Sequence, residues 1–78
     1  MAKKILNLTF PKKLIKEPVI YNLGHKFKIV TNIRKANVTN DYGWVLLEID
    51  GNLEEIQKGE KYLKGLGIIV EDVEIQED

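Results

Sequence analysis

Residues 44–56, WVLLEIDGNLEEI, change within one short stretch from the period of a β-strand to that of an α-helix. Side chains alternate through the first half, which predicts a strand. One set of alternating side chains is wholly apolar: Val45, Leu47 and Ile49. The other set is also largely apolar: Trp44, Leu46 and Glu48. Two apolar faces indicate a central strand, or a strand with one face buried against another molecule.

The second half of this stretch begins a helix. Asn52 is a good N-cap, and Glu55 three residues later resembles the partner residue of a capping box. The apolar stripe that follows predicts a helix over residues 53–66, through Leu53, Ile56, Leu63 and Leu66. Gly67 suits the position just after the helix. Gly59 lies beside the stripe, where the missing side chain lets the helix approach a sheet closely.

The remaining elements lie on either side of this stretch. Residues 28–39 are rich in β-branched side chains, and a turn sequence over 40–43 joins them to the strand as a hairpin. Residues 5–10 alternate up to Pro11 and predict a first strand. A short helix is expected to begin at Pro18 and to end near Gly24, with the apolar positions Val19, Ile20, Leu23 and Phe27. Residues 68–75 predict a final strand.

The predicted order is β-α-β-β-α-β, which is the ferredoxin-like arrangement of an α+β domain. We expect one domain over residues 1–78, with a four-stranded antiparallel sheet of order 4-1-3-2 and both helices on one face. This order brings the lysine-rich first strand beside the acidic last strand. Lys3 and Lys4 are therefore expected to form exposed ion pairs with acids of residues 71–74.

The helices leave one face of the sheet open. The alternation of side chains places Ile5, Trp44 and Leu46 on this open face, with Asn7 and Thr9 beside them. An exposed apolar patch usually marks an interface or a binding site. We expect Ile5, Trp44 and Leu46 to form the interface of a homodimer; the alternative is partial cover by a terminus or loop.

Charge is divided unevenly along a chain whose net charge is zero. Residues 1–40 contain nine Lys or Arg and one acid, whereas residues 41–78 contain eleven acids and three Lys. The division indicates either neutralisation between neighbouring strands or complementary docking to a partner or a second copy.

The residue types exclude most catalytic chemistry. Cysteine and serine are absent and His25 is the only histidine, so no cysteine-bound metal and no serine or thiolate nucleophile can form. We expect no enzyme, no metal and no cofactor. The longest apolar run, residues 67–70, is far below the about 20 residues that span a bilayer. We therefore expect a cytoplasmic domain without membrane insertion.

RNA-recognition modules share this order of elements and provide an alternative. Residues 42–45, Tyr-Gly-Trp-Val, echo part of their aromatic strand motif. However, the open face of the first strand carries Asn7 and Thr9 and no ring on which a base could stack, and zero net charge gives little attraction to phosphates. We therefore expect no nucleic acid as a partner.

Several short stretches, in order and spacing, resemble the NIL domain family over residues 5–75. They are Leu8-Thr9-Phe10, Glu17-Pro18-Val19-Ile20-Tyr21 with Leu23, Thr31-Asn32-Ile33, Leu47-Glu48-Ile49-Asp50-Gly51, Tyr62-Leu63 and Gly67-Ile68-Ile69-Val70-Glu71. The family's Asn-Ile-Leu motif reads Asn32-Ile33-Arg34 here, so its third position differs. Residues 10–12 and 32–36 look most like the branch found ahead of 4Fe-4S ferredoxin domains.

The resemblance implies a regulatory or ligand-binding module, related in architecture to ACT domains, that senses methionine or a related sulfur amino acid. NIL domains of methionine-importer ATPase subunits pair and bind methionine, which suggests a homodimer here. Because they match the family's motif, Asn32 and Ile33 are the expected ligand-binding residues. The alternative is an interaction subunit of a sulfur-transfer or iron–sulfur system, with a ferredoxin-type or sulfurtransferase partner.

Overall fold

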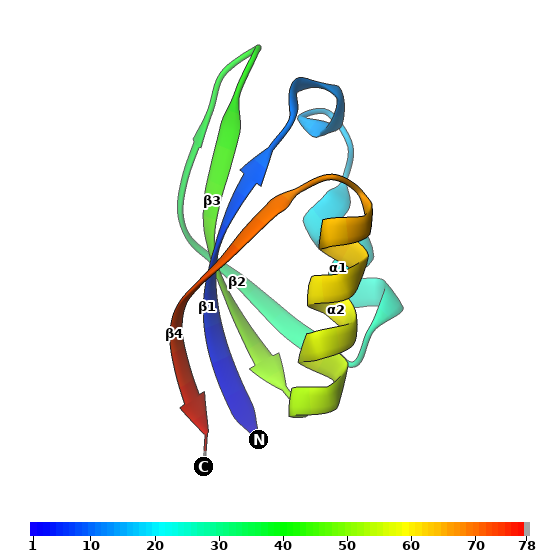
Figure 1. Cartoon of the computed structure of the whole chain (residues 1–78), viewed down its shortest axis with the longest axis vertical. Helices are drawn as coiled ribbons and strands as arrows, with labels where there is room; N and C mark the ends of the chain where they lie inside the picture. The colour runs from blue at the N-terminus through cyan, green and yellow to red at the C-terminus, as the bar shows by residue number, and fades with distance from the viewer. Residues whose placement is uncertain (78) are drawn as a thin grey trace.

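Four antiparallel strands form one sheet in the order β2-β3-β1-β4, and two helices cover one of its faces (Figure 1). This is the predicted ferredoxin-like fold. The computed structural model describes residues 1–77, and the side chains of residues 1–73. The elements are β1 (Ala2–Phe10), the 3-10 helix η1 (Lys12–Leu14), α1 (Val19–Lys26), β2 (Ile29–Val38), β3 (Gly43–Gly51), α2 (Leu53–Gly65) and β4 (Ile69–Glu77).

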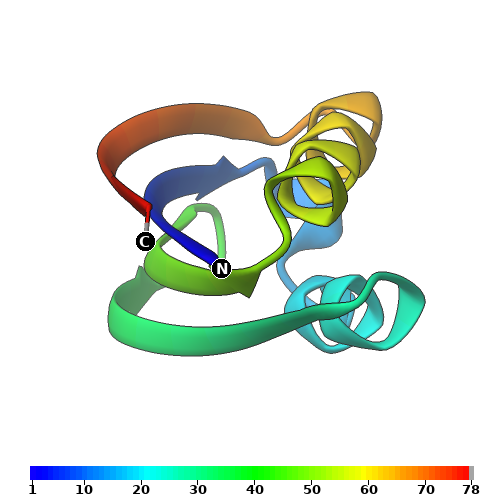
Figure 2. The ribbon, with the colours of Figure 1, turned by 90° about the horizontal axis from the view of Figure 1, so that it is seen from below.

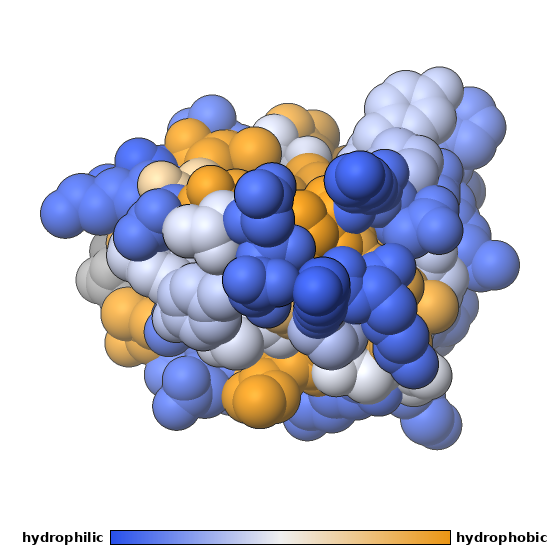
Figure 3. Space-filling model, turned by 90° about the horizontal axis from the view of Figure 1, so that it is seen from above, coloured by the Kyte–Doolittle hydropathy of each residue, from blue (hydrophilic) through white to orange (hydrophobic). Residues whose placement is uncertain are grey.

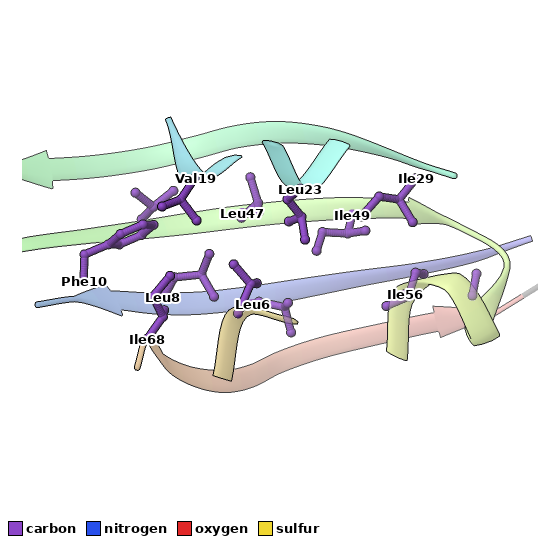
Figure 4. Packing of buried hydrophobic residues seen from close by; sticks show 13 residues of the cluster. Leu6, Leu8, Phe10, Val19, Leu23, Ile29, Leu47, Ile49, Ile56 and Ile68 are labelled. Atoms are coloured by element: carbon purple, nitrogen blue, oxygen red, sulfur yellow. The ribbon is translucent and has the colours of Figure 1, made fainter. Parts of the chain in front are cut away.

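The core lies between the sheet and the two helices (Figure 4). The predicted alternation of the central strands is confirmed, since β1 and β3 both direct one set of side chains beneath the helices. These side chains are Leu6, Leu8, Phe10, Val45, Leu47 and Ile49. The helices contribute Val19, Leu23, Ile56 and Leu63. Burial of each large apolar side chain stabilises the fold by about 1.5–3 kcal/mol.

The start of α2 is capped as the sequence predicts, but without a capping box. Asn52 Oδ1 accepts a hydrogen bond from the Glu54 N–H at 3.0 Å. Glu55 Oε1 instead accepts from the backbone N–H of Lys28 at 3.1 Å, and Glu55 Oε2 accepts from Lys58 Nζ at 3.0 Å. These two contacts, the backbone hydrogen bond first, lower the pKa of Glu55. Glu55 therefore ties α2 to the chain entering β2.

The two helices approach each other at Gly59. A Cβ there would lie 3.2 Å from Leu23 Cδ1 of α1 and 3.4 Å from Ile29 Cδ1 of β2. The predicted close approach of this helix to the sheet is confirmed at Ile29. Helix α1 also comes close to Gly59, at Leu23. Gly67, just after α2, has a φ of 93°, which also agrees with its predicted role.

We expected helix α1 to end near Gly24, but the helix continues for two more residues, to Lys26. The Phe27 N–H still donates to the Leu23 carbonyl at 3.2 Å, so the last turn remains closed. His25 consequently lies in this last turn rather than beyond the helix, and its ring stacks on Tyr21 with 5.7 Å between ring centroids.

The prediction of exposed ion pairs with acids of residues 71–74 is wrong in part for both lysines, because Lys4 reaches Asp72 but is buried, and Lys3 pairs with Glu48 instead. Position 4 has the same parity as Leu6, so its side chain points beneath α2 and the residue is only 6% exposed. Lys4 Nζ lies 2.6 Å from Glu60 Oε1 and 3.3 Å from Asp72 Oδ1. Lys3 has the opposite parity, and its Nζ lies 3.9 Å from Glu48 Oε2 of β3.

We expect Lys4→Met to lower the free energy of unfolding by about 3 kcal/mol, because it leaves a partly buried Glu60 without its cation. The matched control Lys3→Met removes an exposed pair and should cost no more than about 1 kcal/mol. Chemical denaturation of both variants measures the difference. Equal small losses would contradict a structural role for the buried pair.

The stabilisation from the ion pairs of Lys4 with Glu60 and Asp72 depends on pH. Burial lowers the pKa of Lys4, but the hydrogen bonds and charges of Glu60 and Asp72 outweigh it and hold the pKa above its ordinary value of 10.5. The stabilisation is thus fully present below pH 10.5 and is lost as the pH rises through the raised pKa. The difference in unfolding free energy between the unmodified chain and Lys4→Met should therefore shrink as the pH rises through that alkaline range, which denaturation at a series of pH values measures.

Candidate ligand-binding face of the sheet

The face of the sheet opposite the helices carries the candidate site. Both helices lie on one side of the curved sheet, as Figure 2 shows from below. The other side is hollowed to a volume of about 390 Å³. Side chains from all four strands and from the β2–β3 turn line this hollow: Asn7, Thr9, Lys35, Tyr42, Trp44, Leu46 and Val73.

Asn7 is the most informative residue of the hollow. Its Oδ1 atom is buried and has no hydrogen-bond partner among the described residues. A buried acceptor without a donor costs about 1–3 kcal/mol, so native proteins rarely retain one without a reason. A ligand in the hollow whose N–H or O–H group comes within hydrogen-bond reach of this oxygen would satisfy it.

The other walls divide into an apolar and a polar part. Trp44 and Leu46 are half-buried and Val73 is exposed, so together they offer an apolar surface. Lys35 brings a positive charge and Thr9 a hydroxyl group. An apolar pocket with a few convergent polar groups is the usual form of a small-molecule site.

Of the three residues predicted for a dimer interface, Trp44 and Leu46 lie half-buried on the open face, as expected. Ile5 is also on this side, but it is only 5% exposed, so the predicted exposure of Ile5 is wrong. It belongs to a central strand and is flanked by Glu48 of β3 and by the backbone of β4 at Glu74. Neighbouring strands on both sides leave it little contact with solvent.

Asn32 and Ile33, the predicted ligand residues, do not line the hollow. Asn32 pairs with Glu48 and lies exposed on the open face, whereas Ile33 pairs with Leu47 on the helix side of β2 and is 52% exposed. Adjacent residues of a strand point to opposite faces, so the structure does not bring these two side chains together. Their role in ligand binding stays a prediction.

A β-bulge explains why Lys35 is easily overlooked. The pairing of β2 with β3 shifts between Ile33 and Lys35, which leaves Arg34 as the extra residue. The bulge reverses the alternation, so Lys35 joins Leu46 on the open face although position 33 faces the helices. Only the spacing of Lys35 from the turn at 40–43, counted backwards along the hairpin, would have indicated this placement.

A second hollow lies at the end of the molecule that carries η1 and the β2–β3 turn. It has a volume of about 300 Å³ and is lined by Lys12, Lys13, Ile15, Lys16, Asn40 and Asp41. Figure 3 views this end and shows mostly hydrophilic residues with hydrophobic ones between them. Lys12 Nζ already pairs with Asp41 Oδ1 at 3.0 Å. The structure describes no unpartnered buried group in this hollow, so the open face is the stronger candidate.

Two further properties concern the described part of the chain. Within it, no three His, Cys, Asp or Glu side chains lie together in a way that could hold a metal ion. Neither described helix has the length and apolar character needed to cross a bilayer.

The sequence matches the model of the NIL domain over residues 4–72. This chain belongs to the NIL domain family. It is 34% identical over 74 residues to the methionine import ATP-binding protein MetN of Helicobacter pylori strain J99, and 31% identical to the protein of that name from Helicobacter acinonychis strain Sheeba. Each match covers 90% of this chain and 23% of the relative. The chain thus spans about a quarter of the length of these relatives.

A solved structure supports the fold. The crystal structure of the C-terminal domain of an ABC transporter/ATP-binding protein from Enterococcus faecalis superposes with a TM-score of 0.78 at 20% identity. The superposition covers 90% of this chain and 82% of that domain. At this identity the likeness shows that the two domains share a fold.

Asn7→Leu tests the unpaired acceptor in the absence of a ligand. Leucine has nearly the same shape and removes the buried oxygen, so we expect unfolding free energy to stay unchanged or to rise by about 1 kcal/mol. Asn37→Leu, at an exposed position of the same face, is the control and should stay within about 0.5 kcal/mol of the parent. A clear loss of stability in Asn7→Leu would show that its amide is already satisfied.

Proposed function

We propose that this NIL domain is a non-catalytic regulatory module that binds methionine or a related sulfur amino acid in the hollow of the open face. The observation that carries the proposal is the buried, unpartnered Asn7 Oδ1 in a hollow with apolar walls and a lysine. The relatives named for methionine import support the choice of amino acid.

The hollow offers a partner for each part of such a ligand. Asn7 Oδ1 and the Thr9 hydroxyl can accept hydrogen bonds from an α-ammonium group, and Lys35 can pair with an α-carboxylate. A thioether side chain then lies on the apolar wall of Trp44, Leu46 and Val73. Sulfur contacts with an aromatic ring contribute about 0.3–1.5 kcal/mol and favour methionine over a shorter apolar amino acid.

We propose a regulatory rather than a catalytic role because the described residues that line the hollow include no acid and no histidine. The hollow holds groups that bind and orient a ligand, and its threonine and lysine have no base arranged to activate them. We propose that occupancy is read by a partner in the cytoplasm, in the manner suggested by relatives that are ATP-binding proteins of methionine import. The homodimer predicted from the sequence is part of this proposal.

Isothermal titration calorimetry with methionine tests the site. We expect the unmodified chain to bind, and Asn7→Leu to weaken binding by about tenfold or more, because the ligand's donor loses its acceptor. Trp44 is the only tryptophan, so its fluorescence emission should report the same binding event. Leucine and norleucine, titrated in parallel, separate recognition of the sulfur from recognition of an apolar side chain.

Asn32→Ala is the matched comparison for this experiment. Loss of binding in Asn32→Ala with full binding in Asn7→Leu would move the site to the family's motif position. Failure of the unmodified chain to bind methionine or homocysteine would overturn the proposal and favour the interaction subunit of a sulfur-transfer or iron–sulfur system.

Association is tested separately by sedimentation velocity. The unmodified chain should sediment as a dimer, and Trp44→Glu should weaken the dimer because it places a charge on the half-buried apolar wall. Circular dichroism of the variant serves as the check that both helices persist. A chain that remains monomeric at high concentration would contradict the predicted homodimer.

A further inference from the structure

The outer strand β2 is largely exposed. It pairs with β3 on one side only, and every residue of the strand after Thr31 is exposed. Figure 2 shows β2 as the outermost strand, with α1 beside its beginning. An edge strand directs every second pair of backbone N–H and C=O groups away from its sheet. β2 therefore offers a row of hydrogen-bonding groups to a further strand.

The two sides of this edge differ in chemical character. Ile33 and Val38 belong to the helix side of the strand, yet they are 52% and 57% exposed, because they lie beyond the part of β2 that α1 covers. Asn32 and Lys35 belong to the open side and are also exposed. A strand that pairs with β2 meets apolar side chains on one face and polar, cationic side chains on the other.

The charge of this region specifies the polar half of such a strand. Residues 18–40, which include α1 and β2, contain no Asp or Glu. They contain four Lys or Arg, of which Lys28 and Lys35 form no ion pair with a described side chain. Cations along an edge disfavour pairing with an edge of the same charge, including β2 of a second copy, and favour a strand that carries carboxylates.

A hollow between α1 and the beginning of β2 provides room for one side chain of the added strand. It has a volume of about 410 Å³, and its apolar walls include Ile20, Tyr21, Ile29 and Val30. Tyr21 and Val30 are 69% and 65% exposed, which is unusual for such large side chains on two adjacent elements. The hollow therefore continues the apolar side of the edge toward α1.

Gly24 keeps this hollow open. It lies inside α1, and its φ is not positive. A Cβ at this position would make an ordinary contact, 3.6 Å from Thr31 Oγ1. Neither the backbone nor the packing requires a glycine here, and glycine is less favourable than alanine inside a helix. Space for a side chain from outside the domain accounts for its presence.

We propose that an extended segment of a partner protein adds to the sheet as a fifth strand along β2, with apolar side chains on the helix side and carboxylates on the open side. In this mode of recognition, main-chain hydrogen bonds provide affinity and pockets for alternate side chains provide specificity. One apolar side chain of the segment fills the hollow beside α1, and others contact Ile33 and Val38. A carboxylate of the segment pairs with Lys35.

This inference goes beyond the proposed function, because the added strand needs no bound methionine. Among the described residues, only Lys35 belongs both to the edge of β2 and to the hollow of the open face. Methionine binding by the unmodified chain is therefore scored by its own calorimetric titration. Failure of either experiment leaves the other proposal standing.

A blocked ten-residue peptide of alternating valine and glutamate is the probe for the fifth strand. We expect it to shift the backbone amide NMR signals of β2 in the full chain and to leave those of β4, the other edge strand, in place. The same peptide with lysine in place of glutamate should bind at least about tenfold more weakly. No binding of the glutamate peptide up to about 1 mM, or equal binding of both peptides, would overturn the proposal. Shifts confined to residues 12–16, or to Asn7 and Trp44, would also overturn it.

Methylation of the peptide nitrogens tests the backbone pairing directly. The valine nitrogens are methylated in one peptide and the glutamate nitrogens in another, so that each peptide loses the donors of one of its two edges. At least one of the two should bind about tenfold more weakly than the parent peptide, and the one that loses binding reveals the direction of the added strand. Full binding by both would overturn the proposed pairing.

Gly24→Leu tests the hollow with the glutamate peptide. Leucine occupies the space of the peptide's side chain, so we expect binding to weaken about tenfold. The matched control is Gly65→Leu, in α2, where a Cβ would meet nothing within 4 Å and binding should equal that of the unmodified chain. Circular dichroism checks that both variants fold. If Gly24→Leu does not fold, Tyr21→Ala removes an exposed wall of the hollow and should weaken binding as well. Unchanged binding in the folded variant would overturn the role of the hollow.

Discussion

Two short helices cover one face of a four-stranded sheet, and the other face of the central strands has no cover within the described chain. This constraint shapes the rest of the molecule. The inward side chains of β1 and β3 form a continuous apolar core with α1 and α2. The outward side chains of the same strands must mix polar and apolar character, because they meet solvent, a ligand or a second molecule. The hollow with Asn7 and Trp44 is the result of that mixture.

The fold could be predicted in nearly all its parts because its signals are local. Alternation in β1 and β3, the Asn52 cap and the glycine after α2 all depend on neighbouring residues, and the structure agrees with each. The errors arose where a residue's partner lies far away in the sequence. The carboxylate of Glu55 turns to the backbone of Lys28, and Lys4 finds Glu60 beneath a helix 56 positions away. The end of helix α1 was a smaller error: the Leu23 carbonyl still accepts the Phe27 N–H, so the last turn closes beyond Gly24, and a glycine only favours a helix end.

The candidate site was harder to predict than the fold. Trp44 and Leu46 could be placed on the open face from alternation alone. The prediction of Asn32 and Ile33 rests on a family motif, and the structure places their side chains on opposite faces of β2. The placement of Lys35 on the open face depends on a bulge. The bulge shifts the alternation by one residue and cannot be recognised from the residue types of the strand. The burial of the Asn7 oxygen can be recognised only from the structure. In the sequence, an asparagine in a strand is equally consistent with a side chain in solvent.

The buried lysine has a consequence for how the chain folds as it is synthesised. Lys4 leaves the ribosome well before the carboxylates that neutralise it, Glu60 and Asp72, which follow more than 50 residues later. The first strand also pairs with the last on one side. Until the C-terminal half emerges, a folded sheet would have to bury an unpaired ammonium group, which is strongly unfavourable. Folding of this domain is therefore postponed until its last strand has emerged, and the early segments remain available to chaperones during that interval.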